Sequence, residues 1–472
     1  MTSGTKKAAR GAWVVVAILV WVSAASAQDQ PQDQPPPKPA AHAPIIDTNQ
    51  EPETVTDPNA LQPDTTPLTG IQGPGIGAVD FRHSYWVPGF QVANTAQSNG
   101  ISNWSDTTYL AGTVSLYEAW SHSKLALNYS GGGYLSTSGG QGNGAYQELG
   151  FTQSFEWQRF QLQLIDQFSY LPTTGFGFGG LSNLGLPGVG GSLAPGVLTP
   201  SGTFLPGQNN LIATGPQYSN SFAAQATYVV SSRGSITAVG SYGILRFVDP
   251  GNIDTNDEVG SIGYNYQLTK KDSLGVLYRF AGYRFSGLSQ AINDHNFNLA
   301  YGRKITGRIG LSLFAGPEIT TFRVPIGNKT RQTQVSAGAS VSYALENGGI
   351  TAAYSHGANG GSGVLAGAYG DNFTLSGSRQ ITRLWAARAN MGYGRSHAFE
   401  PNGVIGPIYN SYYFGAGLQR PIGRNSLLSF GYTAYIENTN SAACGGACSG
   451  GTAVQHQFAV GYQWHTRPFV LH

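Results

Sequence analysis

The amino-acid sequence predicts an all-β protein, specifically a transmembrane antiparallel up-and-down β-barrel. Two observations support this fold class. Across residues 105–464, stretches of about ten residues alternate apolar with small or polar side chains, as barrel strands do when one face meets lipid and the other lines a lumen. The stretches are joined alternately by tight, mostly charged turns and by longer connections rich in Gly, Asn and Pro. This order is expected of a chain that runs up and down around a barrel.

The alternation is clear in the segment 427–436. One predicted face carries Leu428, Phe430, Tyr432, Ala434 and Ile436, and the other carries Leu427, Ser429, Gly431, Thr433 and Tyr435. The segment 334–345 divides in the same way. The second face is too small and polar to form the core of a β-sandwich, which favours a lumen.

The composition agrees with a barrel and excludes some classes of function. The chain has 66 Gly, 12% aromatic residues and only 11% charged residues, whereas a soluble domain usually has about a quarter charged residues. The formal net charge is +2 and no strongly basic segment is present. We therefore expect no nucleic-acid partner.

Residues 1–27 resemble a signal peptide. An apolar stretch, Gly11–Val22, lies between a basic start and the A-x-A cleavage pattern Ala25–Ala27. The basic residues are Lys6, Lys7 and Arg10. The stretch is too short to cross a bilayer as a helix. A signal anchor is the alternative interpretation.

Residues 28–77 are predicted to be a disordered, Pro-rich periplasmic linker. Gln, Asp, Pro, Thr and Ala dominate it, and such a composition cannot bury a core. A featureless spacer and a segment that reaches a periplasmic partner are both consistent with it. The barrel itself is assigned to residues 78–472.

The connections predict the strand number. Tight turns are expected at 121–123, 158–159, 231–234, 269–272, 303–307, 346–349, 379–383 and 420–425. Longer connections are expected near 137–144, 172–216, 248–257, 286–291, 323–330, 357–370, 397–407 and 438–452. An even number of strands then requires one more strand before residue 105, at Val79–Val92, although Pro88 weakens a ladder there. We expect about 18 strands, or 16 if the hairpin 350–376 is irregular.

Taken together, these features resemble a bacterial outer-membrane porin-type β-barrel. The resemblance covers nearly all of residues 78–472 and is architectural. Such proteins commonly end on an aromatic residue in the last strand, and this strand has Phe458, Val460, Tyr462 and Trp464 on one face. His465–His472 continue beyond it, so either Trp464 or Phe469 is the terminal aromatic residue.

The resemblance implies a place in the bacterial outer membrane, with lipids and small hydrophilic solutes as partners. Its first functional expectation is a channel for passive or weakly selective diffusion. The alternatives are an export or partner-coupled barrel for a polymer such as an exopolysaccharide, and a surface-recognition barrel. The sequence does not predict the oligomeric state.

Five charged residues are candidates for lining the pore. Alternation places Glu148, Arg279, Asp294, Glu318 and Arg388 on the inner face. A basic side chain facing lipid at the bilayer midplane would cost about 2–4 kcal/mol, which favours this assignment. The five could orient a solute. The alternative is that they pair with one another and keep the lumen wet.

Two segments depart from the regular pattern. Asp166 shares the parity of apolar residues, so we expect either a β-bulge near Ile165 that swaps the faces or a position high enough to reach headgroups. The connection 171–217 is long and contains scattered apolar residues. We expect it to fold into the lumen as a constriction, with a mobile surface loop as the alternative.

The remaining chemistry is limited. Cys444 and Cys448 are the only cysteines and are candidates for a disulfide in an oxidising compartment. His295, His356, His397 and His456 have no local context that selects a catalytic partner. We predict no enzyme activity, no catalytic residues, no metal site and no cofactor.

Overall fold

The computed structural model describes the strands and most of their connections. It covers residues 84–99, 104–136, 143–171, 216–286, 290–323, 330–345, 347–361, 365–399, 406–423, 425–440 and 451–471. All of them belong to one compact unit, Thr48–His472. The predicted leader and linker, residues 172–215 of the long connection, and both Cys444 and Cys448 lie outside the described residues.

Within this part of the chain there are eighteen long strands and one short strand, β19. The first nine are β1 (Tyr85–Asn99), β2 (Trp104–Ala119), β3 (Ser123–Ser136), β4 (Gly144–Glu156), β5 (Phe160–Leu171), β6 (Gln217–Ser231), β7 (Gly234–Phe247), β8 (Thr255–Gln267) and β9 (Asp272–Phe285). The others are β10 (Ala291–Lys304), β11 (Ile309–Arg323), β12 (Thr330–Leu345), β13 (Gly348–Gly361), β14 (Ala366–Gln380), β15 (Ala386–Ala398), β16 (Ile408–Ile422), β17 (Ser426–Thr439), β18 (Gly451–His465) and β19 (Phe469–Val470).

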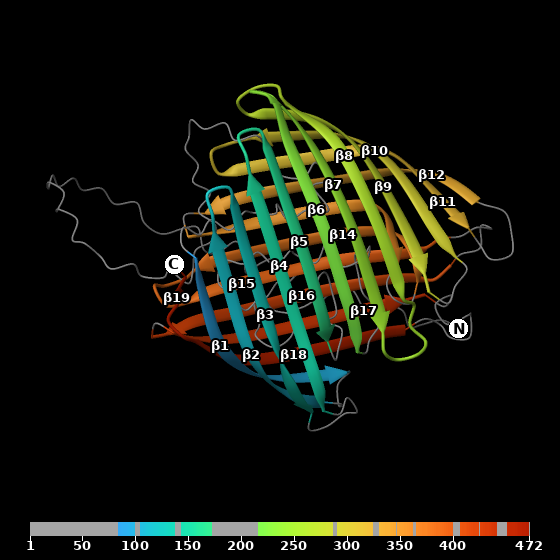
Figure 1. The fold of residues 1–472 in the computed structure, drawn as a ribbon. Coiled ribbons are helices and arrows are strands. Elements are labelled where there is room, and N and C mark those ends of the chain that lie inside the picture. Colours follow the sequence, from blue (N-terminus) through green and yellow to red (C-terminus); the bar gives the residue numbers. More distant parts are fainter. Residues whose placement is uncertain are drawn as a thin grey trace, which may run out of the picture. The chain divides into compact units, whose positions relative to one another are not determined.

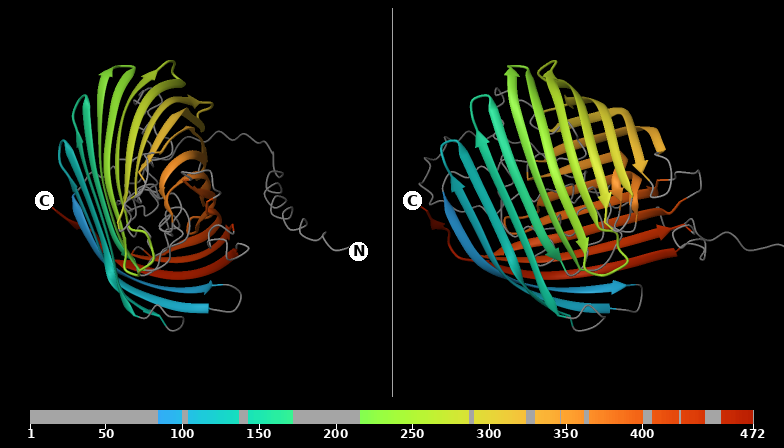
Figure 2. Two further views of the ribbon diagram at one scale, coloured as in Figure 1. Left: turned by 90° about the vertical axis from the view of Figure 1, so that its right-hand side faces the viewer. Right: turned by 45° about the vertical axis from the view of Figure 1, so that its right-hand side comes forward.

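The strands form a closed antiparallel barrel (Figures 1 and 2). Each long strand pairs with the next one in sequence, and β1 closes the ring by pairing with β18 from Gly89↔His465 to Asn99↔Gln455. Closure pairs the backbone of the first and last strands, which an open sheet would leave exposed. The prediction of a barrel with about 18 strands is confirmed, and the hairpin on which the 16-strand alternative depended is a regular antiparallel pair.

The first strand differs from its prediction. It was expected at Val79–Val92, but β1 runs from Tyr85 to Asn99, and residues 79–83 lie outside the described part. Pro88 is inside β1, at the point where the partner changes from β18 to β19. A residue without an N–H is tolerated there because the partner strand is interrupted. The Pro88 carbonyl still accepts a hydrogen bond from the Thr466 amide at 2.9 Å.

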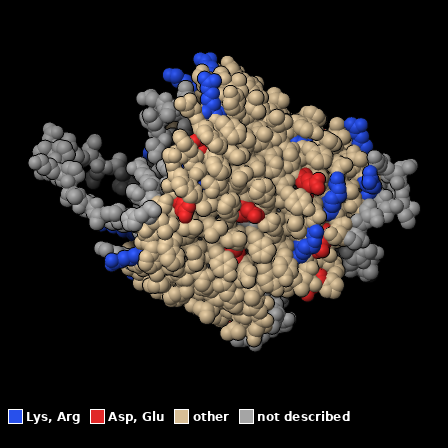
Figure 3. Space-filling model, in the orientation of Figure 1, with Lys and Arg blue, Asp and Glu red and all other residues tan. Residues whose placement is uncertain are grey.

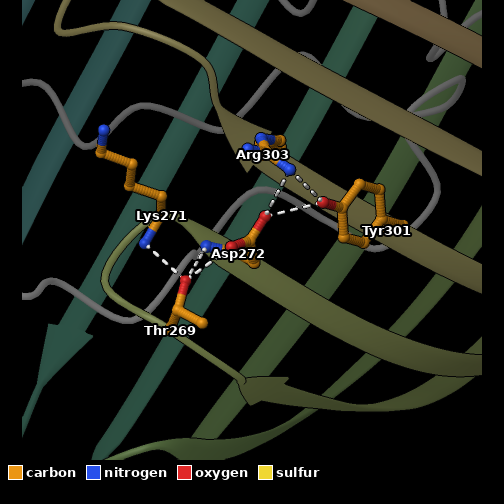
Figure 4. A network of polar contacts seen from close by, with 5 residues as sticks. All are labelled: Thr269, Lys271, Asp272, Tyr301 and Arg303. Atoms are coloured by element: carbon orange, nitrogen blue, oxygen red, sulfur yellow. Dashed lines mark hydrogen bonds and ion pairs between the residues drawn. The ribbon is translucent and has the colours of Figure 1, made fainter.

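Side chains at a tight turn fasten neighbouring strands together. In the β8–β9 turn the Thr269 hydroxyl accepts hydrogen bonds from the Lys271 and Asp272 amides and donates one to the Asp272 carboxylate at 2.6 Å (Figure 4). From β10, Tyr301 donates a hydrogen bond of 2.6 Å to the same carboxylate, and Arg303 lies 3.7 Å from it. The turn is thereby connected to a strand that follows it.

The two faces of the wall differ in chemistry. Large apolar side chains point outward and are exposed, for example Val276 (60%), Leu299 (56%) and Phe297 (50%). Inward positions hold small or polar residues, such as Gln163 and Asn298. In Figure 3 the Lys and Arg side chains gather near the ends, and the broad side in view contains few charges. This is the polarity expected of a barrel surrounded by lipid.

The predicted bulge near Ile165 is wrong. β5 pairs in continuous register with β4 and β6, and Asp166 remains on the outer face opposite Phe222. Its carboxylate accepts a hydrogen bond of 2.8 Å from the Asn220 side-chain amide. Asp166 therefore stays on the outer face and is stabilised there by a polar partner on the next strand. Local alternation could not reveal this partner. A position near the headgroups remains a prediction.

Candidate functional site

Three of the five predicted residues meet on the inner wall. Arg279 on β9 is opposite Asn296 on β10, which in turn is opposite Glu318 on β11, so the three form one cross-strand row. Asp294 lies two residues from Asn296 on the same face of β10. Side chains in such a row are close enough to interact.

This polar wall cluster, defined as Arg279, Asp294, Asn296 and Glu318, is buried. The exposures are 7%, 0%, 2% and 0% respectively. The Arg279 guanidinium interacts electrostatically with both carboxyl groups and donates a hydrogen bond of 3.3 Å to the Tyr283 hydroxyl. Charges buried at this depth require partners of opposite sign or hydrogen bonds.

The cluster keeps unused hydrogen-bonding capacity. Among the described residues, Arg279 Nε and Asn296 Oδ1 have no hydrogen-bond partner. One is a donor and the other an acceptor, and they belong to the same row. Both atoms are buried, so these groups could bind a polar molecule in the lumen only after their cover moved away.

The end of the β13–β14 hairpin covers this cluster. β12 and β13 pair only as far as Ala337↔His356. Beyond that pair, residues 330–336 of β12 pair with β11 alone and residues 357–361 of β13 pair with β14 alone, within the described strands. In Figure 2 the orange hairpin leaves the line of the yellow strands. We call this end, residues 357–361 and 366–370, the hairpin tip.

Direct contacts place the hairpin tip against the inner wall. The Ala358 amide donates to both Glu318 carboxylate oxygens, at 3.1 and 3.2 Å. The Thr320 hydroxyl donates to Asp294 at 2.9 Å and lies 2.9 Å from the Tyr369 hydroxyl. Thr320 is on β11 and Tyr369 is on β14, and side chains from strands so far apart can meet only on the concave side of the wall.

An apolar cluster supports the tip on the side of the longer connections. Its buried members are Ala281, Tyr283, Phe285, Ile292 and Phe322, with Ala366 and Phe399 packed against them. The Phe399 ring centroid lies 4.3 Å from that of Phe322 and 4.8 Å from that of Tyr369. These aromatic contacts join β11 to β14 and to the end of β15.

The other two predicted residues lie elsewhere. Glu148 on β4 shares the inner face with Tyr146, which belongs to a second buried group and accepts a hydrogen bond of 2.9 Å from Gln91 on β1. Arg388 on β15 is exposed, near the β14–β15 turn, on the face that carries Asn390. The structure does not bring Glu148 or Arg388 to the polar wall cluster.

Sequence reasoning missed several residues of the site. Tyr283 and Thr320 were not singled out, and Tyr369 falls in the predicted connection 357–370, which instead is mostly strand. The Ala358 contribution is a backbone amide, which no side-chain pattern reveals. For Tyr369, alternation gave no signal, because the residue shares the parity of the exposed Phe373 and would have been placed on the outer face.

Two other features, metal-binding groups and apolar helices, can be assessed in the described part of the chain. Among those residues no group of three or more His, Cys, Asp or Glu side chains could hold a metal ion. No helix in the same part is long and apolar enough to cross a membrane.

Three solved structures illustrate what the fold resembles. The outer membrane protein OpdK of Pseudomonas aeruginosa matches with 10% identity, 81% of this chain and 99% of that chain covered, and a TM-score of 0.42. OccAB4 of Acinetobacter baumannii matches with 10% identity, coverage of 83% and 100%, and a TM-score of 0.43. OpdQ of P. aeruginosa matches with 9% identity, coverage of 82% and 100%, and a TM-score of 0.42. No protein-family model and no curated protein matches the sequence.

Proposed function

We propose that this protein is a bacterial outer-membrane channel through which small hydrophilic solutes diffuse. The observation that carries the proposal is the closed barrel with an apolar outer face and a polar inner face. A closed ring satisfies its backbone without water and so can stand in lipid. Its inner face then offers hydrogen-bonding groups to water and solutes.

The polar wall cluster and the hairpin tip together form the narrow part of this channel. Two carboxyl groups and one guanidinium are buried in the wall behind the tip, so charges of both signs act on a passing solute from beneath this cover. Mixed charge orients a dipolar solute and favours weak selectivity over strong exclusion of one ion. Weakly selective diffusion is thus the finer part of the proposal.

Planar-bilayer recording of the purified protein tests the proposal. We expect stepwise conductance from the protein alone, and swelling of proteoliposomes in small sugars but not in large dextrans. The preparation must first show a folded barrel, as a band whose migration changes on boiling and a β-rich circular dichroism spectrum in detergent. A heat-modifiable, detergent-dependent protein that gives no conductance and no swelling contradicts the channel function.

A further inference from the structure

The hairpin tip has a second position available to it in the wall. The ladder between β12 and β13 runs regularly down to the turn and stops at Ala337↔His356. Continuing the same register would pair Ser336 with Gly357, Val335 with Ala358 and Gln334 with Asn359. Both strands already extend far enough to make these pairs, because β12 begins at Thr330 and β13 ends at Gly361.

The two positions satisfy backbone groups in different ways. In the inturned position, the Ala358 amide donates to the Glu318 carboxylate, whereas in the paired position it would face β12. The inturned position adds the contacts of Tyr369 with Thr320 and Phe399, and the paired position adds ladder hydrogen bonds. Because each position gains what the other loses, a few side-chain contacts set the equilibrium between them.

The backbone of the tip suits a moving element. Gly357, Gly360 and Gly361 lie in the segment that would change partners, and glycine adopts two conformations at low steric cost. Gly367 has φ +83°, a left-handed value, and a Cβ there would lie 2.0 Å from Ile292 Cδ1 and 2.8 Å from Phe399 Cε2. A side chain at position 367 would therefore be strained by the backbone in the inturned position and would displace the side chains of Ile292 and Phe399.

The consequences for the lumen are opposite in the two positions. In the inturned position the tip covers Glu318, Asp294 and Thr320, which are each 0% exposed. Residues 368–370 of the tip remain paired with the end of β15, from Ala368↔Ala398 to Gly370↔Ser396, so only the β12–β13 side of the tip is open. Pairing along β12 would close that side, carry the end of β15 with the tip and uncover the polar wall cluster. This movement would therefore both widen the lumen and expose its charged groups.

We propose that the β13–β14 hairpin tip is a gate that exchanges between the inturned position and a position zipped to β12. The zipped position is the more conductive one. The part of the proposal that concerns conductance rests on the proposed channel function. The part that concerns the two positions of the tip does not.

A disulfide trap tests the structural half. In a Cys444→Ser/Cys448→Ser background, Val335→Cys/Ala358→Cys places two thiols opposite each other only in the zipped position. Val341→Cys/Ala352→Cys is the matched control, because that pair lies in the existing ladder and repeats the same kind of site further along it. We expect both variants to crosslink under mild oxidation while remaining heat-modifiable. Crosslinking of the control alone shows that the tip is fixed and overturns the proposal.

Conductance tests the gating half. Oxidised Val335→Cys/Ala358→Cys protein should conduct severalfold more than the same protein after reduction, and the control should not respond to oxidation. If Val335→Cys/Ala358→Cys forms the crosslink but its conductance does not change, the two positions exist but the tip is not a gate. If neither variant conducts at all while both crosslink, the channel function has failed and the movement of the tip stands.

A single substitution gives a test without cysteines. Gly367→Ala should disfavour the inturned position and raise the mean conductance severalfold. Gly377→Ala, in the same strand, is the control because its Cβ would meet only ordinary contacts at 3.6 Å. Equal conductance of these two variants in folded protein speaks against the gate.

Discussion

At the residue scale, the two buried carboxyl groups of the polar wall cluster share one cation. Arg279 is the guanidinium that interacts with both Asp294 and Glu318. Parity alone predicted an inner-face position for these three residues, and all three are buried. It could not show that they meet, because the meeting depends on the registers of β9, β10 and β11, which are set by pairing over whole strands.

Arg279→Met is predicted to make the channel prefer cations. The substitution removes one positive charge from the wall, so the cation-to-anion permeability ratio should rise; the variant should also lose roughly 3 kcal/mol of stability, as when a buried ion pair is broken. Reversal potentials in a salt gradient measure the ratio. Arg388→Met, which removes an exposed charge away from the cluster, should have a smaller effect. Equal shifts from both would mean that the cluster does not control ion passage.

The outer-face pair of Asp166 and Asn220 permits a second prediction. Asn220→Ala leaves the carboxylate without its hydrogen bond and should lower the free energy of unfolding by about 1–3 kcal/mol. Asp166→Leu combined with Asn220→Leu removes both polar groups and should restore or exceed the original stability. Urea titration of the protein in detergent or liposomes measures both. A double variant less stable than the single one would show that water, and not lipid, surrounds Asp166 and Asn220.

At the element scale, regular strands were predictable and the hairpin tip was not. Strand positions follow from alternation and turns, which are local, so β2 to β12 were expected near where they lie. The tip has glycines at 357, 360, 361, 367 and 370, a composition typical of a connection. Whether it pairs with β12 or crosses the inner wall depends on contacts with Glu318, Thr320 and Phe399, which are distant in sequence.

The closing seam favours Trp464 over Phe469 as the terminal aromatic residue of the barrel. Trp464 pairs with both Phe90 on β1 and Ser426 on β17, whereas Phe469 on β19 pairs with Trp86 alone and is 48% exposed. Trp464→Ala should therefore cost about 2 kcal/mol and reduce the yield of folded barrel, and Phe469→Ala should cost less than about 1 kcal/mol. Heat-modifiable fractions after refolding compare the two. The opposite order would make β19 the essential terminus.

At the scale of the whole molecule, the fold class followed from the sequence because one periodicity repeats around the entire ring. The regular alternation of short and long connections predicts β2 to β18, which the structure keeps, and the even count needed the further expectation of a strand before residue 105. The candidate site was only half predicted, since its cover and its apolar support come from strands far apart along the chain. The leader, the linker, the constriction by residues 171–217 and the Cys444–Cys448 disulfide remain predictions.

Orientation in the membrane is a further whole-molecule prediction. The tight turns should face the periplasm and the longer connections the exterior, as in barrels generally. A cysteine at Ser232, in the β6–β7 turn, should not react with an impermeant thiol reagent in intact cells, whereas one at Asp249, in the β7–β8 connection, should react. Both positions are exposed, so accessibility within the barrel does not bias the comparison. Reaction of the cysteine at position 232 but not of the one at 249 would show that the orientation is the reverse of the predicted one.

The pairing of β1 with β18 has a consequence for how this chain could be rearranged. Both strands reach the rim of tight turns, with Tyr85 beginning β1 and His465 ending β18. The ring has no privileged first strand, since every ladder is made between neighbours. Joining these two strand ends by a short linker and cutting the chain at an exposed turn such as Lys270–Lys271 would preserve every ladder between the long strands and lose only the two pairs of β19. The protein is therefore a candidate for circular permutation, with new termini at whichever rim an engineer requires.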